Sequence, residues 1–117
     1  MRHRVKKIHL GRTKSHRTML LKQLAVSLFL YEDIETTLAK AKKLRPYAER
    51  LITLAKEDSV TLRRKAGTKL THKNAVKKLF EVIGPQYKTR AGGYTRIRRS
   101  YRREGDRAEM ARIALVK

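Results

Sequence analysis

The charge of this chain limits, more than any other feature, what it can fold into and remain stable alone. Its 117 residues include 31 Lys and Arg but only 10 Asp and Glu, which gives a formal net charge of +21. Such a charge destabilises a compact monomer through self-repulsion. We therefore expect a polyanionic partner. Nucleic acid is the strongest candidate, because its regularly spaced phosphates release counterions when Lys and Arg bind.

The charge is divided between two basic segments. The first 31 residues hold eight Lys and Arg and no acid. Seven of the ten acids fall between Glu32 and Glu81, and seven of the sixteen residues from Lys88 to Arg103 are again basic. The pattern predicts two basic regions on either side of a more neutral middle.

Composition excludes several other classes of protein. The 40% of apolar residues suffices for one small core, so we expect a single globular domain. The absence of cysteine excludes disulfides and thiolate metal sites. No apolar run approaches the roughly 20 residues that span a bilayer, and no apolar segment follows the charged start, as a secretory signal requires. These features favour a cytoplasmic protein without membrane contact.

Helical spacing of apolar residues predicts four helices. We expect them at residues 16–31, 38–56, 60–66 and 72–83, with N-caps at Ser15, Thr37, Asp58 or Ser59, and Thr71. Pro46 allows either a kinked continuous helix or a new helix beginning near it. The common register of Ala41, Leu44 and Ala48 favours the continuous helix. Gly67 is expected to end the third helix, and the Gly84-Pro85 pair the fourth.

The remaining segments predict a small sheet. Strands are expected at residues 33–36, 94–102 and 109–116, the last two joined by a turn at 103–107. Residues 1–14 have no sustained period and predict an extended basic arm. The fold class is therefore α+β: residues 15–117 form one two-layer domain, with about four helices packed on a small three-stranded sheet.

The second strand carries the densest row of arginines. Alternation puts Thr95, Ile97, Arg99 and Tyr101 on one face and Tyr94, Arg96, Arg98 and Ser100 on the other. If Ile97 faces the helices, Arg96 and Arg98 stand on the outer face beside the Tyr94 ring. Guanidinium forks suit phosphate oxygens. A solvated charged face usually mixes both signs, and this strand has no acid, so we favour contact with nucleic acid.

The glycine pair before this strand has two interpretations. Gly92 and Gly93 either make a turn that needs positive φ, or bring bare backbone N–H groups close to a phosphate. Spacing alone does not decide between them, although the flanking Arg90 and Arg96 favour phosphate.

Three further surfaces are candidate nucleic-acid contacts. The arm would order on binding folded RNA, and the N-terminus of the first predicted helix would present amides to phosphate. A weaker patch lies on the second predicted helix. The residues are Arg2, His3, Arg4, Lys6, Lys7 and Arg12 in the arm; Lys14, Ser15, His16 and Arg17 at the helix start; and Lys40, Lys42, Lys43 and Arg45 in the patch.

We find no signal for catalysis, a metal or a cofactor. His3, His9 and His16 lie among cations, which disfavour a metal ion. Asp33 and Glu35 resemble a catalytic carboxylate pair, but without a third partner we expect ion pairs with nearby lysines. The sequence lacks a phosphate-binding P-loop, a GxSxG motif and an HExxH motif.

Several segments, taken in order, carry a family resemblance. They are MRHR at 1–4, SHR at 15–17, TTLAKAKKLRP at 36–46, LITLAK at 51–56, RR at 63–64, LF..IGPQY at 79–87, RAGGYTRI at 90–97 and GDRAEMARIALV at 105–116. Over essentially its whole length the chain resembles the family of the seventeenth protein of the bacterial large ribosomal subunit. Ser100 and Ala114 depart from the pattern, where a glycine and an acid are expected.

The resemblance implies a structural, non-enzymatic protein of the bacterial 50S subunit. It also implies binding to 23S rRNA, neighbouring large-subunit proteins as partners, no small-molecule substrate, and a place near the polypeptide exit side of the cytoplasmic ribosome. For the fold it implies a small mixed sheet. From the residues alone, two alternatives stay open. One is an architectural DNA-binding protein, although no helix-turn-helix is evident. The other is a nuclease or RNA-modifying enzyme, which the missing catalytic groups disfavour.

Overall fold

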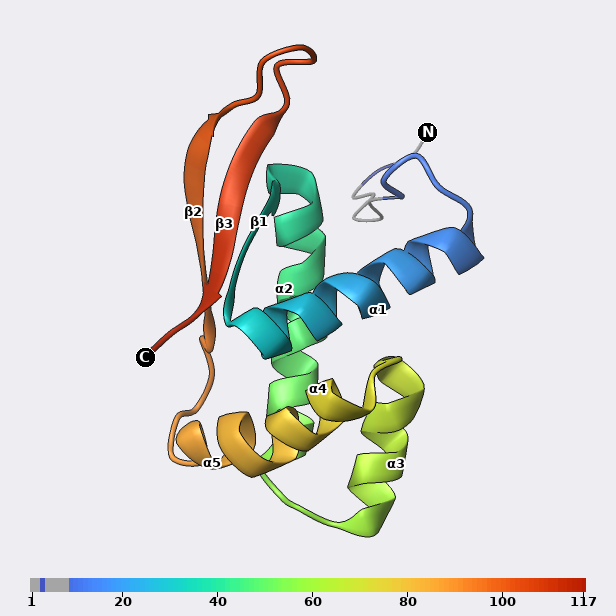
Figure 1. Ribbon diagram of the computed structural model, residues 1–117, viewed down its shortest axis with the longest axis vertical. Coiled ribbons are helices and arrows are strands. Elements are labelled where there is room, and N and C mark those ends of the chain that lie inside the picture. The colour runs from blue at the N-terminus through green and yellow to red at the C-terminus, as the bar shows by residue number, and fades with distance from the viewer. Residues whose placement is uncertain (1–2, 4–8) are drawn as a thin grey trace.

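The computed structural model describes residue 3 and residues 9–117, and it confirms the α+β class (Figure 1). In chain order its elements are α1 (Lys14–Tyr31), β1 (Asp33–Thr37), α2 (Leu38–Ala55), α3 (Val60–Lys69), α4 (Lys73–Lys78), the π-helical turn η1 (Leu79–Ile83), α5 (Gly84–Gln86), β2 (Thr95–Arg102) and β3 (Glu109–Leu115). Within these described ranges, no helix is both long and apolar enough to cross a bilayer.

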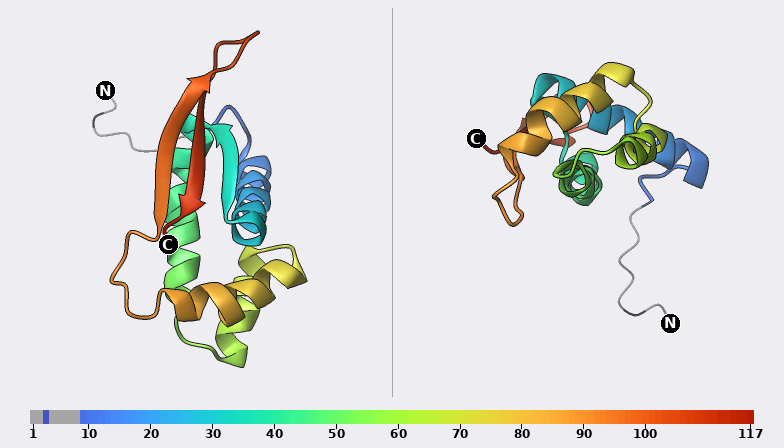
Figure 2. Two further views of the ribbon diagram at one scale, coloured as in Figure 1. Left: turned by 60° about the vertical axis from the view of Figure 1, so that its left-hand side comes forward. Right: turned by 90° about the horizontal axis from the view of Figure 1, so that it is seen from below.

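The sheet is antiparallel throughout. Its strand order is β1-β3-β2, and β3 runs antiparallel to both neighbours. The expected mixed sheet is therefore wrong. β1 and β2 do run in the same direction, but β3 lies between them, so no parallel pair forms. Figure 2 shows the three strands side by side, with the helices gathered on one face.

Helix α2 carries the central stripe of the core. It runs without interruption across Pro46, as the register of its apolar residues predicts. The stripe consists of Leu38, Ala41, Leu44, Ala48, Leu51, Ile52 and Ala55, all of which are buried. From the sheet, Ala111, Ile113 and Leu115 are buried in the same core. Removing this apolar surface from water is the main favourable term that holds helices to sheet.

Helix α1 begins two residues earlier than predicted. Thr13, not Ser15, is the N-cap: its backbone is extended and its carbonyl accepts the Arg17 N–H at 2.9 Å. The buried face consists of Leu21, Ala25, Leu28 and Phe29. Tyr31 is 73% exposed because the helix ends there and the chain turns into β1.

Helix α3 confirms one expected boundary and contradicts another. The Ser59 side chain caps it by accepting the Leu62 N–H at 3.2 Å. The helix does not stop at Gly67 but continues to Lys69, and the Leu70 N–H still donates to the Ala66 carbonyl at 2.9 Å. Gly67 keeps helical geometry, so a glycine alone does not end this helix.

The fourth predicted helix also starts and ends elsewhere than expected. His72, not Thr71, is the N-cap of α4. Helical structure does not end at Gly84-Pro85, because the π-helical turn η1 precedes this pair. In that turn the Gly84 N–H donates to the Leu79 carbonyl, five residues back. Such a widened turn accommodates a proline, which lacks an N–H and crowds an ordinary helix. Helical structure therefore extends to Gln86.

Candidate nucleic-acid interface

Strand β2 divides its side chains as alternation predicts over its first half. Arg96 lies opposite Ala114 and Arg98 opposite Arg112, and both arginines of β2 are exposed on the outer face. Ile97 pairs with Ile113 and packs against the core on the inner face. The outer face at this edge of the sheet therefore presents guanidinium groups.

A β-bulge changes the pattern in the second half of β2. Arg99 pairs with Ala111 and Arg102 with Glu109, so three steps on β2 match two on β3. The extra residue brings Tyr101 to the outer face, where its hydroxyl donates to Glu35 Oε1 at 2.7 Å. This hydrogen bond raises the pKa of Tyr101. The expectation that Tyr101 shares the face of Ile97 is wrong for that reason.

Tyr94 is part of the core and not of the basic surface. It precedes β2 and is only 2% exposed. Its ring lies 5.2 Å from that of Tyr87, with the Lys56 ammonium 4.9 Å from its centroid. The Lys56 ammonium, and secondly the Thr53 hydroxyl, lower the pKa of Tyr94. The predicted aromatic ring beside the arginine row is therefore absent from that face.

The loop before β2 is anchored to α2 and turns at the glycine pair. The Arg90 carbonyl accepts from Lys56 Nζ, and Arg90 Nε donates to the Gly92 carbonyl at 3.1 Å. Gly93 has φ +62, a left-handed conformation that favours glycine. A Cβ at either glycine would meet no atom within 4 Å, so packing does not require them. The turn at Gly93 is thus structural, and contact with phosphate stays a prediction.

Most of the carboxylates are held by basic side chains. Among the described residues, eight of the ten acids form ion pairs: Glu32, Asp33, Glu35, Glu49, Asp58, Glu81, Asp106 and Glu109. Arg112 holds Asp33 at 3.2 Å and Glu35 at 3.4 Å, so the predicted ion pairing is right but its partner is an arginine of β3. At the hairpin tip, Arg103 and the Ala108 N–H lower the pKa of Asp106 to about 2.

The arginines of the loop and of the first half of β2 differ from those paired cations. Within residues 9–117, no ion pair involves Arg90, Arg96, Arg98 or Arg99. All four are exposed. The strand edge farthest from the acids of β1 is therefore the one whose positive charge is not compensated.

The start of α1 forms a second basic surface. Ser15 and His16 are exposed, whereas Arg17 is half-buried and donates to His9 Nδ1 at 2.9 Å and to the Arg12 carbonyl at 3.3 Å. Thr13 makes no side-chain cap, and this first turn contains no acid. Its amides therefore meet the conditions for binding an anion. His3 is exposed, and the predicted contacts Arg2, Arg4, Lys6 and Lys7 lie outside the described residues.

The structure keeps the predicted surfaces apart. Strand β2 and its preceding loop lie on one side of α2, and the start of α1 lies on the other (Figures 1 and 2). Lys40 and Lys43 lie on α2 and are half-buried. The molecule measures 43 × 32 × 26 Å. The two basic surfaces therefore lie on opposite sides of α2.

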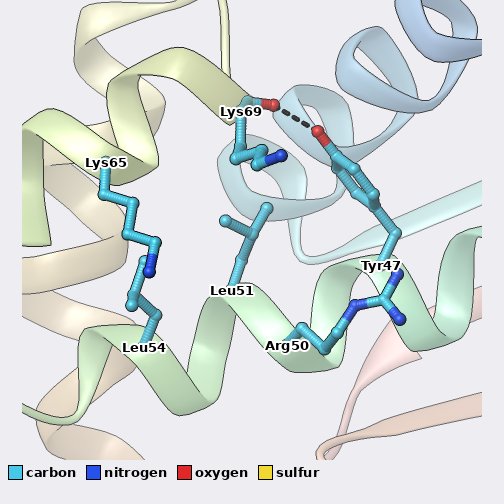
Figure 3. Close-up of a pocket in the computed structure, with 6 residues that line it drawn as sticks. All are labelled: Tyr47, Arg50, Leu51, Leu54, Lys65 and Lys69. Atoms are coloured by element: carbon cyan, nitrogen blue, oxygen red, sulfur yellow. Dashed lines mark hydrogen bonds between the residues drawn. The ribbon is translucent and has the colours of Figure 1, made fainter.

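Sequence reasoning missed a basic pocket between α2 and α3. This open pocket has a volume of about 420 Å³ and is lined by Tyr47, Arg50, Leu51, Leu54, Lys65 and Lys69 (Figure 3). A signal was available: Lys40, Lys43, Tyr47 and Arg50 recur at spacings of three and four, so they share one face of α2. Nothing in the sequence indicated that α3 would lie beside that face.

One comparison with known proteins identifies the family. A family model described as Ribosomal protein L17 matches residues 20–116.

The chain belongs to the ribosomal protein L17 family.

Members of the L17 family are structural proteins of the large ribosomal subunit and serve translation without being catalysts. The family implies rRNA and other large-subunit proteins as partners and the ribosome as location. The match confirms the resemblance. It includes the loop, β2 and β3, and it begins at Leu20, so the arm and the start of α1 lie outside it. Over residues 3 and 9–117, no three His, Cys, Asp or Glu side chains gather as a metal site would need.

Proposed function

We propose that this protein binds folded 23S rRNA in the cytoplasmic ribosome and holds its shape, through basic surfaces on opposite sides of the domain. Arg90, Arg96, Arg98 and Arg99 would grip one RNA segment. The amides and cations at the start of α1, with the basic arm, would contact another. Lys40 and Lys43 would add a weaker contact from α2.

The observation that carries this proposal is the separation of paired from unpaired cations. Asp33 and Glu35 pair with Arg112 on β3, whereas Arg96 and Arg98 on β2 are exposed and form no ion pair with any acid in the described part of the chain. Guanidinium groups that face water in a row are suited to consecutive phosphates. Contacts of this kind fix the position of an RNA segment without reading its bases. Neutralising and bracing rRNA, with no chemistry on it, is the role these surfaces support.

Removing two of these arginines tests the proposal. Arg96→Ala combined with Arg98→Ala should reduce the slope of log affinity against log salt by up to about two, since each lost phosphate contact removes about one unit. The measurement is binding of the full chain to a structured 23S rRNA fragment across a salt series.

A matched control removes equal charge elsewhere. Lys73→Ala combined with Lys77→Ala takes two exposed cations from α4, and this variant should keep the original slope. Equal slopes for both double variants would contradict the assignment of β2. Equal affinity of the unaltered protein for duplex DNA and for the rRNA fragment would contradict RNA as the partner.

A further inference from the structure

The pocket between α2 and α3 combines an apolar floor with a rigid aromatic wall. Leu51 is buried and Leu54 half-buried beneath it. The Tyr47 hydroxyl donates to the Lys69 carbonyl at 2.6 Å, which ties α2 to the C-terminal end of α3 (Figure 3). Because the hydroxyl is already used, the pocket presents the ring of Tyr47 to an occupant. Its volume of about 420 Å³ lies in the range of small-ligand sites, roughly 300–1,000 Å³.

All the charged residues that line the pocket are cations. Arg50 comes from α2, and Lys65 and Lys69 come from α3. All three are exposed, and among the described residues none of them forms an ion pair. The lining contains no acid. Three uncompensated cations around an aromatic and aliphatic floor fit an occupant that joins an anion to a flat apolar group.

We propose that this pocket receives one unpaired rRNA nucleotide, with its base against Tyr47 and the leucines and its phosphate among Arg50, Lys65 and Lys69. The inference rests on the proposed function and adds a site for a single extruded base to surfaces that otherwise contact only the RNA backbone. Bases taken out of a helix commonly stack on aromatic side chains of RNA-binding proteins.

The face of α2 favours RNA over an acidic peptide as the occupant. Lys40 and Lys43 precede Tyr47 and Arg50 on the same helix face, so cations continue from the pocket along about 15 Å of helix. An RNA strand carries a phosphate at every nucleotide and can follow such a row. A peptide would need acids placed at matching intervals.

Two variants of Tyr47 isolate the role of the ring. Tyr47→Phe keeps the ring and removes the hydrogen bond to Lys69, whereas Tyr47→Leu removes both. At near-physiological salt, a short single-stranded oligoadenylate should bind Tyr47→Phe nearly as well as the unaltered chain and Tyr47→Leu roughly ten-fold more weakly. In the unaltered chain, the oligoadenylate should shift the NMR signals of the Tyr47 ring and the Leu54 methyls. Equal affinity of the two variants would overturn the proposal.

Charge variants and other ligands complete the test. Lys65→Gln with Lys69→Gln should reduce the salt slope for oligoadenylate, while Lys73→Gln with Lys77→Gln should not. Two other ligands test the nucleotide assignment by the same NMR signals of Tyr47 and Leu54. If inorganic phosphate shifted them as strongly as oligoadenylate does, the pocket would be a simple anion site. If a peptide of alternating Asp and Phe did so, the occupant would be a protein partner, and either result would overturn the proposal. If these pocket variants behaved like the unaltered chain while rRNA binding still depended on Arg96 and Arg98, the pocket proposal would be wrong and the proposed function would be retained.

Discussion

At the scale of single residues, two glycines in helical conformation differ in whether packing requires them. A Cβ on Gly84 would lie 2.2 Å from the Ala55 carbonyl oxygen, so the absence of a side chain lets the end of the η1 turn approach α2. A Cβ on Gly67 would meet nothing within 4 Å. Gly84 is therefore required by packing, whereas Gly67 only weakens α3 through its backbone entropy.

This contrast predicts opposite changes in stability for the same substitution. Gly84→Ala should lower the free energy of unfolding by about 3 kcal/mol or more, because the contact is with backbone and cannot be relieved by a side-chain rotation. Gly67→Ala should raise it by about 0.5–1 kcal/mol. Urea denaturation of the two variants measures both effects. A neutral Gly84→Ala would mean that η1 and α2 do not meet as described.

At the scale of elements, the Glu49 carboxylate joins the start of β2 to α2 by hydrogen bonds. Glu49 Oε1 accepts the Thr95 hydroxyl at 2.9 Å and the Thr95 N–H at 3.3 Å, at the buried start of the strand. Arg45 lies 3.6 Å from the same oxygen. The strand that carries Arg96 and Arg98 is thus held to α2 at its first residue, in addition to its pairing with β3.

Removing that carboxylate should loosen the start of β2. Glu49→Ala leaves the buried polar groups of Thr95 without this acceptor, which should cost about 1–3 kcal/mol. Amide exchange at residues 95–97 should accelerate as well. Glu57→Ala is the matched control, since it raises the net charge equally but removes an exposed acid, and it should change stability by less than about 0.5 kcal/mol. Equal effects would attribute the loss to charge alone.

The sequence predicted elements with a strong period and missed those that depend on neighbours. The α2 stripe and the inward Ile97 followed from spacing alone. Tyr94 and Tyr101 were assigned to the wrong surroundings because burial by Tyr87 and a bulge opposite β3 are tertiary facts. Likewise, Gly84-Pro85 is a strong stop signal that a π-helical turn overrides, and the α2–α3 pocket requires knowing which helices are adjacent.

At the scale of the whole molecule, repulsion among cations dominates electrostatics. The ion pairs over residues 9–117 use eight carboxylates, yet the net charge of the chain is +21. Salt screens both the repulsion among the cations and the attraction within the ion pairs. The loss of repulsion should be the larger effect, because each surface ion pair contributes little to stability.

We accordingly expect salt to stabilise the free protein. Raising sodium chloride from about 0.01 M to about 0.1 M shortens the Debye length from about 30 Å to about 10 Å, and the thermal midpoint should rise over this interval. Differential scanning calorimetry measures it. A falling midpoint would indicate that the ion pairs outweigh the repulsion and that the free domain does not need a polyanion.

The strand order β1-β3-β2 also determines when the sheet can form while the chain is being synthesised. β3 is made after both of its neighbours, and neither β1 nor β2 pairs with any other strand of the sheet. While the chain is being translated, the segments of α1 through α5 can leave the ribosome and begin to pack, but the sheet must wait until residue 115 has emerged. Arg96 and Arg98 on β2 are therefore held in place only after β3 has been made. A nascent chain should consequently reach its full affinity for RNA late in synthesis and not gradually.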